Sequence, residues 1–564
     1  MREARRGEYM MLTEERPEDV FCSPFWELRA DRAPQPVVML MGEAGTLALS
    51  VNPYTDLPEG GFVRNGIRAE LPDRIAVSAG YTNDPVTYTN RRTPTPSTAQ
   101  YACEGHLRGR IYAMPGGRTE TAAAIIRSEY ALTRETPAFR RTTREAAQAL
   151  LDAFLQVSWN DAWHNYTNCD CHLWTQPELK SWRQLPEIGW TAGAILAYPF
   201  LLAEDLLRLP EDTFAGKLSG PDIADEIASA WDPAGGMIND VTRPDWKPDW
   251  EPNPVNGWWA YLGLTSDCHC AYTNGSAVYY LLKMLLLLKE KGEDRPAWRS
   301  AALGTLDTVL SLQREDGSLG YTYSRYERKV LDWDGFAGCW FAAAMPLAYR
   351  LTGEERYLRA CERALDFYGT SVRSLCCTGT PMDTWKSVDQ EGNLAFIRAA
   401  RLMHEVTGGE RFLKDLRDGA HYQFLWQYGF RARPECPPLK GHWNSCGGSI
   451  TSVSNPHVHP MGVLVIEDLY YLSRVTGDSY YADRARDQYA WAMQCLELYP
   501  DVSGYGRYGL LTERYCPSDG LTTEQYSDGT HASLWFSYNG WAGANVLEAM
   551  LEALRRENEK EGTL

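Results

Sequence analysis

The sequence predicts a mainly α-helical protein, an (α/α)6 toroid preceded by an N-terminal β-rich, sandwich-like domain. Long Ala/Leu-rich patterns of helical period run from Thr142 to about residue 556. The connectors between them alternate between short and long, and one helix–turn–helix pattern recurs three times. The predicted domains are therefore 1–140, β-rich, and 141–564, the toroid.

The N-terminal part is predicted to be β-rich because short extended pieces alternate with turn signals. Residues 36–51 read PVVMLMGEAGTLALSV, two apolar runs around a Gly-Glu-Ala-Gly break that suits a hairpin. Asn-Pro, Gly-Gly and Pro-Gly-Gly turns follow at close intervals.

From residue 142 the periodicity predicts helices. Their ranges are 142–158, 187–208, 219–230, 275–291, 296–313, 335–352, 355–370, 392–406, 410–427, 462–475, 478–497 and 540–556.

Several short connectors share one pattern. Thr352-Gly353-Glu354, Thr407-Gly408-Gly409-Glu410 and Thr476-Gly477-Asp478 each place a glycine where one helix ends and an acid where the next begins. Antiparallel hairpins put all short connectors at one end of a ring and all long ones at the other. The long-connector face is therefore the predicted active-site face.

Composition narrows the function further. The 564 residues carry 56 Lys and Arg against 74 Asp and Glu, a net charge of −18. This charge argues against nucleic-acid or anionic-membrane binding through the overall field, although a local basic patch can still hold a small anion. No clean apolar span of about 20 residues is present, and the N-terminus lacks the apolar core of a secretion signal. We therefore expect a cytoplasmic protein whose 14 cysteines are reduced.

The long connectors concentrate the chemistry-bearing residues. They hold seven of the ten histidines, nine of the fourteen cysteines and most tryptophans. Polar loops explain Asp and Glu, but they do not explain His, Cys and Trp together. Loops on a rigid scaffold are where sites form.

This architecture resembles the six-hairpin glycosidase superfamily across residues 141–564. Asp334 precedes a helix, a small/aromatic stretch and a Thr-Gly-Glu turn, and this order is similar to the catalytic hairpin of unsaturated uronyl hydrolases. Glycosidic cleavage needs one protonated carboxyl and one carboxylate. The resemblance implies Asp334 as a catalytic carboxyl, with Asp332 next. Asp267, an acid before another helix, and Asp383, between a turn and an aromatic residue, are the predicted partners. An ordinary helix-capping aspartate is the alternative for Asp334.

Trp and Tyr are predicted to stack on sugar rings, and polar neighbours to bind hydroxyl or carboxylate groups. The predicted substrate-binding residues are Trp333, Trp385, Trp443, Tyr321, Tyr323, Tyr272, His442, Asn444, Arg514 and Glu187.

His457 and His459 form an H-x-H pair, which places both imidazoles on one side of an extended segment. They could bind metal, act as acid and base, or brace the loop. As a base with a tyrosine, such a histidine would perform β-elimination on a uronate, the lyase alternative.

The cysteines suggest a third possibility. Cys268-His269-Cys270 and the pair Cys376-Cys377 could supply soft zinc ligands. They are faintly similar to the toroid-class β-L-arabinofuranosidases, which use a zinc-bound cysteine nucleophile. Small buried thiols that pack the loop bases are the simpler interpretation.

The preferred hypothesis is a glycoside hydrolase that acts on an oligosaccharide with paired carboxylates. No cofactor is expected unless zinc binds, and neither nucleic acid nor membrane is an expected partner. A homo-oligomer and a non-enzymatic glycan-binding scaffold stay open.

Overall fold

The computed structural model describes two short strands, 4–5 and 20–21, and most of the remaining chain. The other described ranges are 25–58, 60–70, 73–80, 105–161, 164–166, 187–189, 193–242, 268–380, 386–453, 457–498, 509–521, 524–536 and 538–561.

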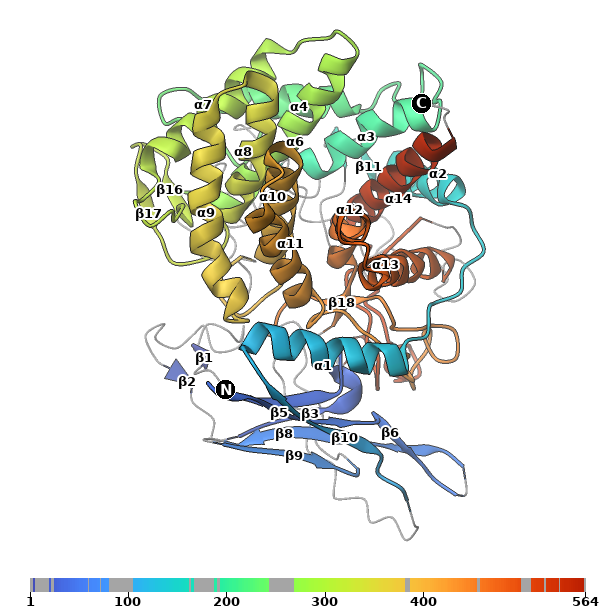
Figure 1. The fold of residues 1–564 in the computed structure, drawn as a ribbon. Coiled ribbons are helices and arrows are strands. Elements are labelled where there is room, and N and C mark those ends of the chain that lie inside the picture. The colour runs from blue at the N-terminus through green and yellow to red at the C-terminus, as the bar shows by residue number, and fades with distance from the viewer. Residues whose placement is uncertain are drawn as a thin grey trace.

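Six helices form a closed inner ring (Figure 1), in which each contacts the next and the last returns to the first. They are α3 (Ala194–Leu206), α6 (Ala271–Glu290), α8 (Cys339–Thr352), α10 (Glu391–Thr407), α12 (Ile466–Thr476) and α14 (Gly540–Glu561). A 3₁₀ segment, η6 (Pro460–Val465), leads into α12 and makes part of its ring contacts.

Six further helices pack outside the ring, one against each inner helix. In the same order they are α4 (Gly220–Ser229), α7 (Pro296–Leu312), α9 (Glu355–Arg373), α11 (Glu410–Gln423), α13 (Ser479–Glu497) and α2 (Thr143–Ala153). The predicted (α/α)6 toroid is therefore confirmed. Its sixth hairpin joins α2 to α14, from opposite ends of the predicted toroid region.

Local signals in the sequence begin and end these helices. Thr142 and Ser219 each form a reciprocal capping box with the acid three residues later. Gly353, Gly408 and Gly477 end α8, α10 and α12 in the left-handed conformation. The three repeated turns are thus confirmed as short links within hairpins.

The long connectors meet at the end of the ring where the inner helices begin, which we call the long-connector end. Strand β15 (Cys268–Cys270) precedes α6, yet it pairs with β16 (Thr322–Ser324) and through it with β17 (Val330–Asp332), both of which precede α8. Short strands within single connectors are β11 (Trp159–Asn160) with β12 (Asn165–Tyr166), β13 (Trp231–Asp232) with β14 (Met237–Ile238), and β18 (Ser449–Ile450) with β19 (Val458–His459).

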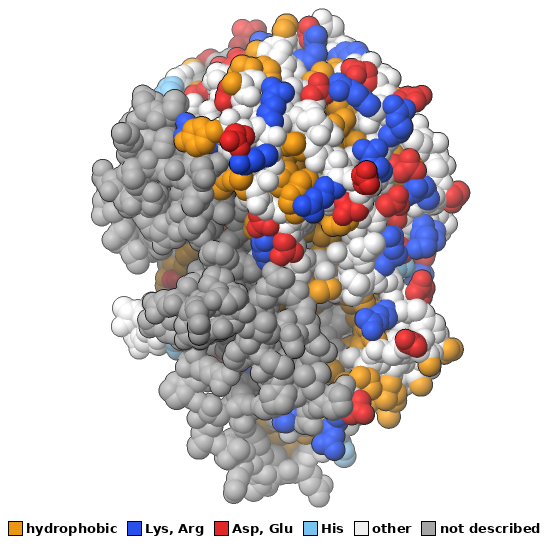
Figure 2. Space-filling view, turned by 90° about the vertical axis from the view of Figure 1, so that its left-hand side faces the viewer, with side chains coloured by type: hydrophobic (Ala, Val, Ile, Leu, Met, Phe, Trp, Pro, Cys, Tyr) orange, Lys and Arg blue, Asp and Glu red, His pale blue; other side chains and the backbone are white. Residues whose placement is uncertain are grey.

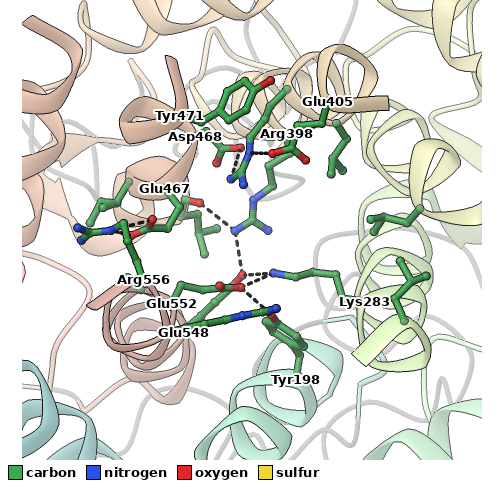
Figure 3. Close-up of a pocket in the computed structure, with 18 of the residues that line it drawn as sticks. Tyr198, Lys283, Arg398, Glu405, Glu467, Asp468, Tyr471, Glu548, Glu552 and Arg556 are labelled. Carbon is green, nitrogen blue, oxygen red and sulfur yellow. Dashed lines mark hydrogen bonds and ion pairs between the residues drawn. The ribbon is translucent and has the colours of Figure 1, made fainter. Parts of the chain in front are cut away.

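Charged side chains cross the middle of the ring. Arg398 of α10 donates to Glu548 of α14 at 3.1 Å, and Tyr280 of α6 donates to the same carboxylate at 2.5 Å. Lys283, one turn beyond Tyr280, bonds Glu548 and Glu552 at 3.3 and 2.9 Å. We call these five residues the axial ion cluster. Beyond it, toward the short connectors, the inner helices enclose a cavity of about 370 Å³ (Figure 3).

The N-terminal strands include two three-stranded antiparallel sheets that contact each other. One is β4 (Val37–Met41), β5 (Gly45–Val51) and β10 (Gly109–Pro115); the other is β3 (Phe25–Arg29), β8 (Gly66–Glu70) and β9 (Arg74–Ser78). Two short pairs add β1 (Ala4–Arg5) with β2 (Val20–Phe21), and β6 (Tyr54–Asp56) with β7 (Phe62–Arg64). The predicted 36–51 hairpin is confirmed by the β4–β5 register.

Helix α1 (Arg118–Thr133) lies inside the region predicted to be β-rich, and the expectation was wrong for this segment. Figure 1 shows α1 between the sheets and the ring, and it contacts β5, β10 and α11. Because protein covers more than one side, α1 needs no single apolar stripe, and this is why helical periodicity did not reveal it.

The outer surface mixes both signs of charge, as Figure 2 shows for one face. Many of these charges form exposed pairs within or between outer helices, such as Arg359 with Glu355 and Arg411 with Glu362. Within the described ranges, no helix is long and apolar enough to cross a lipid bilayer.

Candidate active site

Side chains near the N-terminal ends of the inner helices gather at the long-connector end. The buried ones among the described residues include Glu187 before α3, Tyr272 in α6, Glu391 in α10, His459 before η6, and Trp541 in α14. This end of the ring therefore combines carboxyl, phenol, imidazole and indole groups contributed by different helices.

Glu391 is central to this arrangement. It lies in the first turn of α10 with 5% of its surface exposed. The Tyr272 hydroxyl, from α6, donates to Glu391 Oε2 at 3.1 Å. Because α8 stands between α6 and α10 in the ring, this bond crosses the opening rather than joining adjacent helices. Burial, followed by the charge of Glu391, raises the pKa of Tyr272 well above its usual value.

Asp389, two residues earlier, caps the same helix. Its carboxylate accepts the backbone N–H groups of Gly392 at 3.3 Å and Thr380 at 3.2 Å. Complete burial raises its pKa to about 7, against the lowering effect of these hydrogen bonds. Its oxygens already serve the backbone, so Asp389 positions the start of α10 and the adjacent Glu391.

Asp240 likewise binds groups at the start of α6 and so positions that helix. It accepts from the Cys270 N–H at 3.2 Å, the Thr273 hydroxyl at 3.1 Å and the Asn274 amide at 2.6 Å. Burial, together with the nearby charge of Glu187, raises its pKa well above the usual value. Residue-type patterns did not single out Asp240 or Asp389, although Asp389 lies two residues before α10.

Asp334 does not cap a helix. The predicted helix start at 335 was wrong: α8 begins at Cys339, with Gly338 as its N-cap. The Asp334 side chain is 57% exposed and lies 3.4 Å from Lys386 Nζ, which also binds Asp332 at 2.6 Å. Asp334 is therefore a water-exposed carboxyl group beside an ammonium.

The Asp334 segment packs directly onto the start of α10. The backbone N–H groups of Phe336 and Ala337 both donate to the Gly379 carbonyl, at 2.9 and 3.2 Å. The Phe336 ring lies so close to Gly392 that a Cβ there would come within 2.3 Å of it. This packing brings the segment that carries Asp334 against the turn that carries Glu391.

The histidine pair is buried. His457 and His459 flank Val458, whose backbone pairs with Tyr515. Burial, followed by the charge of Arg32 at His457 and of Arg514 at His459, lowers the pKa of both imidazoles well below the usual value, which favours their neutral form. His459 stacks on Trp541 at a centroid distance of 5.9 Å. Neither ring nitrogen of His459 has a hydrogen-bond partner among the described residues.

Arg514 and Glu513 complete this side of the site. Arg514 pairs with Glu513 at 2.6 Å and lies over the Trp535 ring at 3.9 Å. The Trp541 indole N–H donates to Glu513 at 2.9 Å. Glu513 thus holds both the arginine and the ring on which His459 stacks, a role that sequence reasoning missed.

The remaining predicted binding residues occupy different settings. Tyr321 is buried under Lys386, whose ammonium lies 4.6 Å from the ring centroid. The Trp333 ring lies 3.9 Å from the Arg314 guanidinium. Tyr323 is buried, and its hydroxyl accepts the Gly320 N–H at 2.9 Å. Their sugar-stacking roles stay predictions.

On the fifth connector, Trp443 stacks on Tyr515 at 6.1 Å. Asn444 braces the connector through Gln494 at 3.0 Å and the Glu135 carbonyl at 2.8 Å. His442 is exposed. Three further predicted residues, Asp267, Asp383 and Trp385, lie outside the described residues.

The cysteines of the zinc hypothesis are separated into two segments. Cys268 and Cys270 lie on β15, and Cys376 and Cys377 follow α9. Burial raises the pKa of Cys270 and Cys377 well above its usual value. Across the described ranges, no three His, Cys, Asp or Glu side chains are grouped to hold a metal ion.

No protein-family model and no curated protein matches the sequence. Among solved structures, a family 76 glycoside hydrolase from a bovine Bacteroides thetaiotaomicron strain is 11% identical, with a TM-score of 0.48 and coverage of 91% of this chain and 87% of that one. The cellobiose 2-epimerase from Spirochaeta thermophila is 14% identical, with a TM-score of 0.47 and coverage of 78% and 100%. A D-mannose isomerase is 11% identical, with a TM-score of 0.47 and coverage of 74% and 98%. Identities this low do not transfer an activity.

Proposed function

We propose that the chain is a glycoside hydrolase that cleaves an oligosaccharide at the long-connector end of the ring. Glu391 donates a proton to the glycosidic oxygen, and Asp334 acts as the second carboxylate. The C–O bond to the leaving sugar breaks, and the oxygen of water ends on the anomeric carbon. Asp267 and Asp383 stay candidates for the second role.

The observation that carries this proposal is the contrast between the environments of two carboxyl groups, Glu391 and Asp334, whose segments pack against each other. Glu391 is buried, with a phenol donating to it across the ring opening. Asp334 is water-exposed beside Lys386. An acid and a base are commonly separated in this way, because the environment decides which carboxyl keeps its proton.

The test is turnover by Glu391→Gln and Asp334→Asn on a panel of aryl glycosides and oligosaccharides. Loss of a general acid or base typically costs 10²–10⁴-fold in rate. Glu355→Gln, which removes an exposed carboxylate of the outer helix α9, is the matched control and should keep full activity. Full activity in Glu391→Gln would contradict the assignment of the acid.

Aryl glycosides with good leaving groups sharpen the assignment of roles. They need little protonation, so Glu391→Gln should lose much less rate on them than on an oligosaccharide. Asp334→Asn should lose rate on both. An equal loss on both substrates in Glu391→Gln would argue against proton donation.

One observation favours a second function, β-elimination on a uronate. His459 is neutral, buried and unpartnered among the described residues, as a base for proton abstraction would be. The lyase would release an unsaturated product that absorbs in the ultraviolet. Absorbance that grows with an oligouronate and disappears in His459→Gln would establish this reaction instead of hydrolysis.

A further inference from the structure

A large groove lies outside the ring, where α13 ends. Its volume is about 1050 Å³, the size of a site for an extended ligand. Residues 138–141 before α2, together with Glu145 in its first turn, form one wall, and residues 437–442 of the fifth connector form the other. Gln494, Glu497 and Leu498 at the end of α13 form the floor.

Hydrogen bonds hold these three segments together. Glu497 Oε1 accepts the backbone N–H groups of Arg140 and Arg141 at 2.5 and 2.7 Å. Gln494 Oε1 accepts the Asn444 N–H at 3.0 Å, which fixes the opposite wall. The groove is therefore a built feature with fixed walls.

The carboxylates of the groove accept hydrogen bonds from neighbouring protein groups, whereas several of its basic side chains have no acidic partner among the described residues. Glu497 is bound to the backbone, and Glu145 accepts the Thr142 N–H and hydroxyl at 2.8 and 2.9 Å. Arg140, Lys440 and His442 are exposed, and within the described part of the chain none of their side chains has an acidic partner. Arg140, Arg141 and Lys440 against Glu145 and Glu497 leave the lining with a net positive charge, in a chain whose net charge is −18.

The groove also offers an apolar surface. The Phe139 ring is 39% exposed and is held by an edge contact with Tyr489 at 5.7 Å. A fixed, half-exposed ring beside unpaired cations suits a sugar that carries an anionic group, because the ring face contacts C–H groups while the cations meet the charge.

A short path of packed residues links the groove to the histidine pair. His442 lines the groove, and its neighbour Trp443 stacks on Tyr515. The backbone of Tyr515 pairs with Val458, between His457 and His459. The groove thus shares the fifth connector with the candidate active site.

We propose that this groove binds an anionic stretch of the glycan whose bond is cleaved at the long-connector end. It recognises carboxylate or sulfate groups through Arg140, Lys440 and His442. The cleavage of the bound glycan rests on the proposed function, whereas its binding in the groove does not.

The test measures binding by calorimetry with three probes: an oligogalacturonate, a heparin-derived sulfated oligosaccharide and a neutral malto-oligosaccharide. At least one anionic probe should bind, the neutral one should not, and about 0.5 M salt should weaken the binding. The double variant Arg140→Gln/Lys440→Gln should bind about tenfold more weakly. Which anionic probe binds distinguishes the carboxylate from the sulfate source.

The matched control is Arg417→Gln/Lys289→Gln, which removes two exposed cations from α11 and α6 and should leave binding unchanged. Equal binding of the neutral probe, no binding of either anionic probe, or unchanged affinity in the groove variant would overturn the proposal. Binding that follows this pattern without any hydrolysis would refute the hydrolase instead, so the two failures are distinguishable.

Discussion

The axial ion cluster gives the sharpest prediction about stability. Glu548→Ala removes the acceptor shared by Tyr280, Lys283 and Arg398, which come from two different inner helices. Arg398, 4% exposed, would keep its bond to the Leu464 carbonyl at 2.9 Å but lose its counter-ion. Removing one partner of a buried ion pair typically costs about 3–5 kcal/mol, because the other charge is left uncompensated.

The assay is denaturant-induced unfolding monitored by tryptophan fluorescence and circular dichroism. Glu548→Ala should lower the unfolding free energy by about 3 kcal/mol or more, with helix content unchanged in buffer. Glu355→Ala, which removes an exposed partner of Arg359, should have little effect.

A double variant tests whether the unpaired Arg398 charge, rather than the loss of the Glu548 side chain itself, causes the lower stability. Arg398→Met/Glu548→Met removes both charges and fills much of the same space, so it should recover most of the stability lost in Glu548→Ala. A loss below about 1 kcal/mol in Glu548→Ala would refute the view that the cluster is desolvated. A double variant no more stable than the single one would refute the view that the unpaired arginine causes the loss.

Three further predictions follow from caps, glycines and titration. Thr142→Ala should cost about 1 kcal/mol of unfolding free energy, because it removes one half of a capping box. Gly379→Ala and Gly353→Ala share a left-handed backbone, with φ of 80° and 77°, but only Gly379 has neighbours near the added Cβ, so its variant should unfold at lower denaturant. Burial raises the pKa of Asp389 from 3.8 in the unfolded chain to about 7. The folded state therefore binds the extra proton, and this contribution to stability should fall between about pH 4 and pH 7 and then level off. Asp389→Asn should flatten the slope of melting temperature against pH in that window.

The sequence was sufficient to predict the ring, because the signals that mark each helical hairpin are local and repeated. Helical periodicity and the glycines at 353, 408 and 477 mark the hairpins without reference to distant residues. Helix α1 was not predicted, because the sheet and the ring cover it from different sides and it therefore has no single apolar stripe. The start of α8 was misplaced by four residues, because Gly335–Gly338 pack against Gly379 and other loop residues instead of continuing the helix.

The sequence predicted which face of the ring carries the site, but it identified only some of the residues there. The bond between Glu391 and Tyr272 joins residues more than a hundred positions apart. Asp389, whose donors lie 3 and 9 residues away, had a local signal that was missed. Asp240 was missed because its donors lie 30 to 34 residues further along the chain. Residue spacing along a chain cannot report such distances.

The sixth hairpin has a consequence for how the chain assembles. Its two members, α2 and α14, begin at residues 143 and 540, so α14 must find a partner that was synthesised before the rest of the ring. On a ribosome, α3 and α6 through α12 can stack as an open arc, with the apolar flank of α3 uncovered until α14 emerges. Such a closing segment makes the nascent arc a substrate for chaperones, and a chain that stops before residue 540 should aggregate rather than fold.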